Sequence, residues 1–313
     1  MEQRRVASLT VSLVGLGCNN FGMRCDEQRS VEVVHAALDA GITLFDTADT
    51  YGGRGRSEEI LGVGLGSRRD EVVVATKFAN PMDDSGERQG ASARWIVQAV
   101  EDSLRRLGTD RIDLYQQHVP DPSVPIEETL RALDELVRSG KVREVGHSNF
   151  SAAQIDEAAE VATAGGLAPF VTAQNELSLL RRRALDEVLP ACERHGLGML
   201  PYFPLASGVL TGKYRRGEPP PAGTRLAGVP EERRAAALAD AELAKVERLE
   251  AFATDRGHTL LELAFAWLTG LPAMASVIAG ATSPEQVRAN VAAGGWSLDA
   301  ADRAALDALL AQA

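Results

Sequence analysis

The sequence has few cysteines, and their spacing excludes the sites that cysteines usually build. Only Cys18, Cys25 and Cys192 occur among 313 residues. Their number is odd and no two of them form a CxxC pair, so we predict neither a disulfide framework nor a metal site. Unpaired cysteines suit a reducing compartment, and we expect a cytoplasmic protein.

Long apolar runs are also missing. No segment reaches the roughly 18 uncharged apolar residues that a membrane helix needs. The start, MEQRRVASLTVSLVGLG, is basic, but Ser and Thr interrupt its apolar stretch, which does not match a secretory signal. We therefore expect a soluble, unexported chain with no membrane partner.

Blocks of one charge are absent as well. Lys and Arg number 33 against 44 Asp and Glu, which gives a formal net charge of −11. An acidic chain without a basic block is a poor binder of polyanions, so we predict no nucleic-acid partner. The remaining composition, 45% hydrophobic and 25% charged residues, is that of a globular protein.

The sequence does contain a regular alternation of short apolar, β-branched runs with amphipathic helical stretches. This alternation is typical of βα units and a parallel sheet. Eight such units in a chain of this length predict a closed (β/α)8 TIM barrel forming one domain over residues 1–313. A doubly wound open sheet is the alternative. The predicted strands span residues 11–17, 42–48, 72–77, 112–118, 142–149, 171–176, 198–205 and 275–280.

Local signals define several ends and loops. Ser30 and Ser57 are candidate N-caps of two of the helices. The stretch GLGCNNFG at 15–22 lacks the third glycine and the following acidic residue of a dinucleotide fingerprint, so it does not support an open nucleotide-binding sheet. The segment 212–234 is rich in Pro and Gly, and we predict a long irregular loop there with a functional role.

Polar residues stand at or near the ends of the predicted strands, where barrel enzymes place their catalytic groups. Each alone has an ordinary structural explanation, such as a turn residue for Asp46 or a packed, hydrogen-bonded histidine for His118. An aspartate, a lysine, a histidine and a tyrosine on one rim together predict an acid–base site. The residues are Asp46, Lys77, His118, Ser148, Asn149, Gln174 and Tyr202, with Tyr51 in the loop after Asp46.

The chemistry of the four ionisable residues points to protonation of an oxygen. A phenol with a pKa near 10 is a poor acid at neutral pH until a nearby ammonium favours its ionised form. Lys77 can supply that charge to Tyr51, and Asp46 would keep Lys77 charged. His118, as a neutral donor, would hold the substrate oxygen in line. Reduction of a carbonyl by hydride requires such an acid.

Seven stretches resemble the aldo-keto reductase family, in order from Gly15 to Asn290. They resemble most closely the bacterial reductases allied with potassium-channel β-subunits. The resemblance implies a (β/α)8 barrel that reduces small aldehydes or ketones to alcohols with NADPH, with NADH less favoured. The stretches are GITLFDTADTYGGRGRSEEILG, VVVATK, RIDLYQQH, GKVREVGHSNF, TAQNELS, PYFPLASGVLTGKY and GATSPEQVRAN.

The resemblance also implies a role for each catalytic residue. Tyr51 would be the general acid, Lys77 the residue that lowers its pKa and Asp46 the partner of Lys77. His118 would orient the carbonyl. The channel-subunit branch can carry asparagine at this last position, so the histidine favours turnover over a binding role.

The same resemblance implies an NADPH site across the barrel mouth. Ser148, Asn149 and Gln174 would hold the nicotinamide carboxamide, and the ring of Tyr202 would stack on the nicotinamide. Residues near the nicotinamide would be Gly17, Cys18, Asn19 and Asp46; those along the pyrophosphate would be Phe203, Pro204, Leu205, Gly208, Lys213 and Arg225; those at the adenosine phosphate would be Gly280, Thr282, Gln286 and Asn290.

The adenosine-phosphate end departs from the family pattern. Many members have lysine where this chain has Gly280 and arginine where it has Gln286, and Arg288 is the candidate for compensating them. Ser283 is the predicted N-cap of the following helix, with Pro284 at its first position. On the substrate side, Phe21, Phe78 and Val119 are candidate pocket walls.

Two other functions remain open at this point. Lys77 would suit a Schiff-base nucleophile in a barrel aldolase. The alternative from a different class is a cofactor-bound regulatory subunit that resembles the channel β-subunits.

Overall fold

The computed structural model describes residues 1–311; positions 312 and 313, the end of the predicted domain, lie outside the described residues. Eight parallel strands form one sheet in the order β10-β3-β4-β5-β6-β7-β8-β9. The sheet closes because Met199, the last residue of β9, pairs with Met274, just before β10. The predicted (β/α)8 barrel is therefore confirmed, and the open sheet is excluded.

All eight predicted strands are present. They are β3 (Val14–Gly17), β4 (Leu44–Asp46), β5 (Val73–Phe78), β6 (Ile112–Gln117), β7 (Val142–Ser148), β8 (Phe170–Gln174), β9 (Gly198–Met199) and β10 (Val277–Gly280). Their side chains are almost all buried, since the strands face packed residues inside the barrel and helices outside it. Strands covered on both faces read as continuous apolar runs, which is why the sequence reveals them.

The first predicted strand, residues 11–17, corresponds to two separate strands in the structure. An antiparallel hairpin of β1 (Gln3–Val6) and β2 (Leu9–Ser12) precedes β3. Its apolar residues Val6, Leu9 and Val11 pack with barrel-lining residues such as Leu44 and Leu114. The hairpin therefore covers one end of the barrel interior, and β2 and β3 merge in the sequence because both are apolar.

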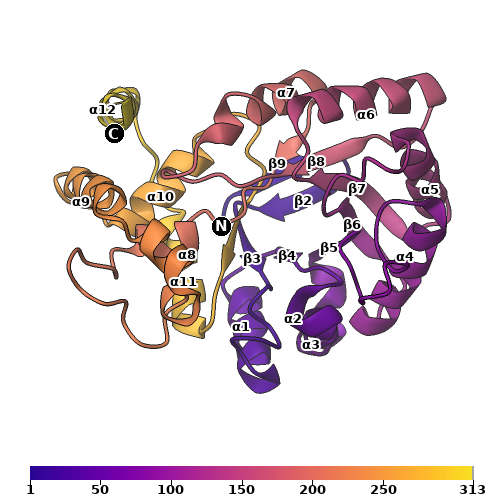
Figure 1. Cartoon of the computed structure of the whole chain (residues 1–313), viewed down its shortest axis with the longest axis horizontal. Helices are drawn as coiled ribbons and strands as arrows, with labels where there is room; N and C mark the ends of the chain where they lie inside the picture. The colour runs from indigo at the N-terminus through magenta and orange to yellow at the C-terminus, as the bar shows by residue number, and fades with distance from the viewer. Residues whose placement is uncertain (312–313) are drawn as a thin grey trace.

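Helices surround the strands on the outside (Figure 1). The largest apolar cluster lies between these helices and the outer face of the sheet. The helices are α1 (Glu27–Asp39), α2 (Tyr51–Arg54), α3 (Arg56–Leu65), α4 (Ala93–Leu107), α5 (Ile126–Arg138), α6 (Ala152–Gly165), α7 (Val188–His195), α8 (Glu231–Ala237), α9 (Asp240–Thr254), α10 (Leu260–Thr269), α11 (Pro284–Ala293) and α12 (Ala300–Ala311).

The two serines predicted as N-caps have other roles. Asp26 caps α1 by accepting the Arg29 backbone N–H at 2.8 Å, and Ser30 lies one turn inside that helix. Ser57 lies inside α3, where its hydroxyl donates to the Cys18 carbonyl at 2.9 Å. Asp26 takes the cap position of α1, and Gly55, in the left-handed conformation, takes that of α3. The two serine hydroxyls therefore bond elsewhere.

The predicted loop 212–234 is mostly irregular, but it ends earlier than expected. A short 3-10 turn occupies Leu226–Gly228, and α8 begins at Glu231. Pro230 precedes two glutamates in the first turn of α8, and both features favour a helix start. The irregular part passes beside α8 and α11 (Figure 1).

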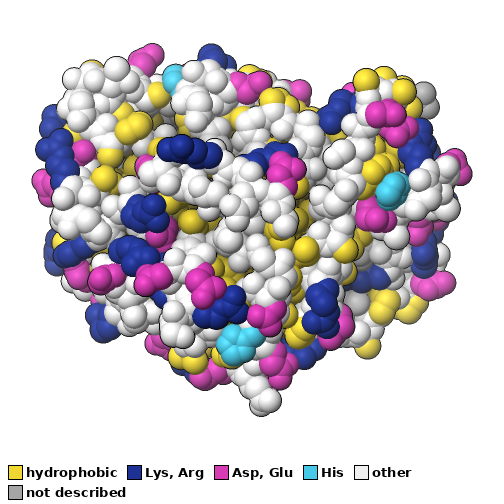
Figure 2. Space-filling model, turned by 180° about the vertical axis from the view of Figure 1, so that it is seen from behind, with side chains coloured by type: hydrophobic (Ala, Val, Ile, Leu, Met, Phe, Trp, Pro, Cys, Tyr) yellow, Lys and Arg dark blue, Asp and Glu magenta, His cyan; other side chains and the backbone are white. Residues whose placement is uncertain are grey.

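The surface carries both charges. Acidic and basic side chains are interspersed over the face seen in Figure 2. Among the described residues, none of the helices is long and apolar enough to cross a membrane. Within residues 1–311, no three His, Cys, Asp or Glu side chains lie close enough together to hold a metal ion.

Candidate active site

A cavity of about 740 Å³ opens at the carboxyl ends of the strands. All predicted site residues except Lys77 and Cys18 line it. Both exceptions are fully buried just behind the wall, and the Cys18 thiol contacts the Leu16 carbonyl at 3.8 Å. The Cys18 thiol therefore does not line the cavity, and the cofactor contact of Cys18 stays a prediction. The predicted pocket walls Phe21 and Phe78 are likewise buried in the core.

Lys77 and Asp46 form a buried ion pair beneath the cavity. The Lys77 ammonium donates to both Asp46 carboxylate oxygens, at 2.8 and 2.7 Å, and to the Thr47 carbonyl at 2.8 Å. Burial alone lowers the pKa of Lys77, but the Asp46 carboxylate and Tyr51 oppose it, and the net pKa is raised above its ordinary value. Lys77 therefore stays charged in spite of being fully buried.

Gln116 is part of this arrangement and was not predicted. Its amide donates to Asp46 at 3.3 Å, next to a second amide donor, Gln174, at 2.9 Å. Gln116 lies two residues before His118 on β6, and alternate residues of a strand share a face. Counting back two residues from His118 along the predicted strand would have identified Gln116 as a site residue.

Tyr51 stands above the ion pair. The Lys77 ammonium lies 5.0 Å from the centre of the Tyr51 ring. Burial raises the pKa of Tyr51, the Lys77 charge lowers it, and the net pKa lies above its ordinary value. Lys77 acts in the predicted direction, but the expectation of a lowered pKa is wrong for this structure because burial outweighs the ammonium. The phenol is consequently fully protonated at neutral pH.

His118 faces Tyr51 across the cavity floor. The two rings are 5.7 Å apart and nearly perpendicular. Burial, with a further contribution from Lys77, lowers the pKa of His118 to about 3. The imidazole is therefore neutral over the whole physiological range, as the predicted neutral donor requires.

Because the pKa of His118 is about 3 in the folded chain against 6.5 ordinarily, acid should destabilise the fold through this residue. Between these values the unfolded chain binds a proton that the native chain does not, so stability falls as pH decreases. We expect His118→Asn to reduce the slope of the unfolding free energy against pH by on the order of 1 kcal/mol per pH unit in this window. Urea unfolding at several pH values measures the slope, and an unchanged slope would contradict the assignment.

The turn that carries Tyr51 depends on glycine. Gly52 has φ +72°, and a Cβ there would lie 2.6 Å from the Phe21 carbonyl oxygen and 2.7 Å from the Ser57 backbone nitrogen. The neighbouring Gly53 also has positive φ, but its Cβ would meet nothing within 4 Å. The close approach at Gly52 brings Tyr51 back over the end of β4.

This difference gives a matched pair of variants. Gly52→Ala should be less stable than Gly53→Ala by about 1–3 kcal/mol, because both strain the backbone but only the first overlaps backbone atoms. Gly52→Ala should also lose activity by displacing Tyr51. Thermal or urea unfolding of the two variants tests the prediction, and equal stabilities would show that the turn can relax.

The three residues predicted at the carboxamide end are already bonded to one another and to their neighbours. Ser148 donates to the Gln174 backbone carbonyl at 2.8 Å. Asn149, with φ +64°, donates to the His118 carbonyl at 3.0 Å and accepts from the Tyr202 hydroxyl at 2.8 Å. Gln174 donates its amide to Asp46, so its side-chain carbonyl oxygen is the group left for a ligand.

The far end of the cavity is cationic. Arg24, Lys213 and Arg225 line it, and within residues 1–311 none of the three forms an ion pair with a carboxylate. Arg225 donates to Asn20 at 3.0 Å. Burial and the neighbouring cations lower the pKa of both Lys213 and Arg225. Such mutual repulsion suits the binding of an anion.

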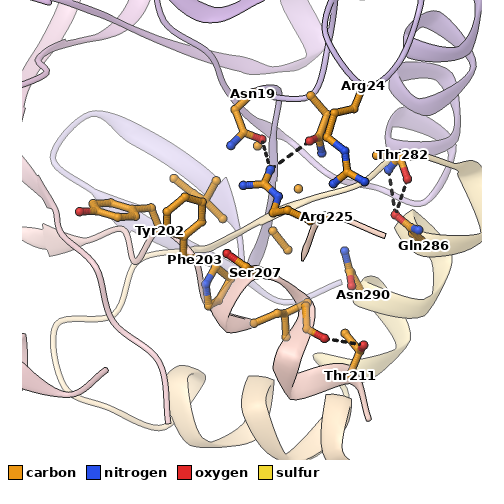
Figure 3. A pocket seen from close by; sticks show the side chains of 18 of the residues that line it. Asn19, Arg24, Tyr202, Phe203, Ser207, Thr211, Arg225, Thr282, Gln286 and Asn290 are labelled. Carbon is orange, nitrogen blue, oxygen red and sulfur yellow. Dashed lines mark hydrogen bonds between the residues drawn. The ribbon is translucent and has the colours of Figure 1, made fainter. Parts of the chain in front are cut away.

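The start of α11 forms the last wall. Ser283 accepts the Gln286 backbone N–H at 3.3 Å and Pro284 takes the first position, so the predicted N-cap is confirmed. Gln286 in turn accepts from the Thr282 backbone and hydroxyl, at 2.8 and 3.1 Å (Figure 3). Arg288 does not line the cavity but pairs with Glu285 at 2.9 Å, so it does not compensate for the missing cations.

Comparison with known proteins agrees with this geometry. The sequence model described as the Aldo/keto reductase family matches residues 13–311. The chain belongs to the aldo/keto reductase family. The resemblance stated from its motifs is thereby confirmed.

Similar proteins come from bacteria and plants. The uncharacterized oxidoreductase YrpG of Bacillus subtilis strain 168 is 37% identical, over 93% of this chain and 90% of its own length. The aldo-keto reductase YhdN of the same strain is 37% identical, over 99% and 94%. A probable voltage-gated potassium channel subunit beta of Oryza sativa subsp. japonica is 38% identical, over 92% and 88%. As an aldo/keto reductase, the chain is an oxidoreductase that uses a nicotinamide cofactor on small carbonyl compounds.

Proposed function

We propose that this aldo/keto reductase reduces aldehydes or ketones to alcohols with NADPH, and that Tyr51 is its general acid. The convergence of Tyr51, the Lys77–Asp46 pair and neutral His118 at one end of a cavity carries the proposal. The other end of that cavity holds cations that pair with no carboxylate of residues 1–311, which suits a phosphorylated cofactor. When bound, NADPH supplies the hydride.

The roles of the residues follow from their contacts. Negative charge develops on the carbonyl oxygen as hydride reaches the carbon, and the Tyr51 phenol donates its proton to that oxygen. The buried Lys77 ammonium stabilises the phenolate that remains, and Asp46 holds Lys77 in place. His118 orients the carbonyl with a neutral imidazole.

The cavity residues fit a nicotinamide dinucleotide. The free side-chain carbonyl of Gln174 is an acceptor for the carboxamide amine, and the ring of Tyr202 lines the same cavity. Lys213 and Arg225 would bind the pyrophosphate. The amides at the start of α11 would face the adenosine end, where helix N-termini favour anions. The residues proposed for that end are Gly280, Thr282, Gln286 and Asn290.

The barrel aldolase is disfavoured by the same geometry. A Schiff-base lysine must reach its substrate, but the Lys77 ammonium is fully buried and already has three hydrogen-bond acceptors. We retain the cytoplasm as the proposed location, because the three free cysteines are buried and unpaired, which suits a reducing compartment.

The proposal is tested by fluorescence titration of the purified protein with NADPH and NADH, followed by assays of nicotinamide absorbance with a panel of aldehydes and ketones. Binding with carbonyl-dependent oxidation of NADPH is the expected result. Binding without turnover on any carbonyl would favour a cofactor-bound regulatory subunit instead of a reductase. Absence of binding would overturn the proposal.

A further inference from the structure

Arg24 is a cavity residue for which the proposed function has given no role. It lies in the loop between β3 and α1, and its side chain lines the cavity. One of its terminal nitrogens donates to the Gly223 carbonyl at 2.9 Å, so the other guanidinium donors are available to a ligand. Figure 3 shows Arg24 pointing into the cavity, with Arg225 on one side and Thr282 and Gln286 on the other.

The loop that carries Arg24 is tied to the turn before α11. Asn20 donates to the Ala281 carbonyl at 3.2 Å, and Arg29 donates to the Thr282 carbonyl at 3.2 Å. These two bonds flank Arg24 in the sequence. The guanidinium is therefore held beside the start of α11, which the proposed function assigns to the adenosine end of the cofactor.

The other cations near this end are already engaged. Arg29 pairs with Glu32 at 2.7 Å, and Arg288 pairs with Glu285; neither lines the cavity. Lys213 and Arg225 both line the cavity from the segment after β9. Of the three cavity cations Arg24, Lys213 and Arg225, Arg24 is the one carried by the loop that is hydrogen-bonded to the turn before α11, at Ala281 and Thr282.

NADPH and NADH differ in charge at a single group. Both carry a pyrophosphate, and NADPH alone carries a third phosphate on the 2′ oxygen of its adenosine ribose. A guanidinium presents paired N–H donors that match phosphate oxygens, and such charge-assisted bonds are strong. The repulsion among three cavity cations is relieved most fully by the cofactor with the extra phosphate.

We propose that Arg24 binds the 2′-phosphate of NADPH and sets the preference for NADPH over NADH. This inference rests on the proposed function, that the cavity holds a nicotinamide dinucleotide. Arg24 takes the place of the cations that other members carry at positions 280 and 286. A lysine at 280 would be crowded here, since a Cβ at Gly280 would already lie 3.2 Å from the Asn20 amide.

The test compares Arg24→Gln with the wild-type chain by fluorescence titration with NADPH and with NADH. The dissociation constant for NADPH should rise at least about tenfold, and that for NADH should stay within about twofold. Competition by 2′,5′-ADP, which carries the same 2′-phosphate, should weaken in parallel. Arg24→Lys, which keeps the charge without the paired donors, should give an intermediate value.

Arg288→Gln is the matched control, since it removes an arginine of α11 outside the cavity, and both dissociation constants should be unchanged. An equal loss of affinity for both cofactors in Arg24→Gln would overturn the inference. Arg24 would then bind a part that NADPH and NADH share, or would only tie its loop to Gly223. Unchanged NADPH affinity would overturn it as well. A wild-type chain that binds neither cofactor would overturn the proposed function itself, so the two failures are distinguishable.

Discussion

Replacing Tyr51 with phenylalanine is expected to lower the rate of carbonyl reduction by about 10²- to 10⁴-fold, the usual contribution of a general acid. The change removes one oxygen and leaves the ring edge-on to His118. Lys77 and Asp46 remain paired beneath it, so the shape of the site should be kept. Single-turnover absorbance measurements with saturating NADPH and an aldehyde report the chemical step without product release.

Two controls make this result specific. Cofactor affinity of Tyr51→Phe, measured by fluorescence titration, should remain within about twofold of wild type if the phenol acts only in the chemical step. Tyr115→Phe removes a second buried phenol, one that lies outside the cavity and has no hydrogen-bond partner in the structure. That variant should turn over normally, and retained turnover in Tyr51→Phe would remove Tyr51 from the acid role.

Lys77→Met is expected to reduce the free energy of unfolding by about 3–5 kcal/mol, the cost of removing one partner of a buried ion pair. The Asp46 carboxylate would stay buried, with only the Gln174 and Gln116 amides to compensate its charge. Activity should fall as well, because the phenolate of Tyr51 would lose the cation that stabilises it. Urea unfolding, with constant dependence on denaturant, measures the stability change.

A double variant separates charge from packing. Asp46→Asn with Lys77→Met removes both charges, so it should recover part of the stability lost by Lys77→Met while activity stays low. The coupling energy from the four chains would then be large, since the two side chains are in direct contact. If the Lys77→Met variant has the same midpoint urea concentration as the wild-type chain, the buried ion pair does not stabilise the fold as the structure indicates.

The prediction of the barrel succeeded where local sequence and tertiary role coincide. Each strand is covered on both faces, so its residues are apolar regardless of which neighbour they meet, and the run is visible without the fold. The catalytic candidates were found because they end those runs. Ser30 and Ser57 were misplaced because a cap depends on which of several nearby groups reaches the free amides first, and Asp26 reaches those of α1.

The sequence by itself determined the alternation of strands and helices, the polar residues at strand ends and the glycines of the Tyr51 turn, since these follow from burial and backbone geometry within short segments. Tertiary structure alone decided the rest. The pairing of β4, β5 and β6 placed Gln116 beside Asp46, and the pairing of β3 with β10 placed the Arg24 loop beside the start of α11, residues far apart in the chain. It also decided that burial, rather than Lys77, dominates the pKa of Tyr51, because desolvation depends on everything packed around a group and no spacing along the chain reveals it.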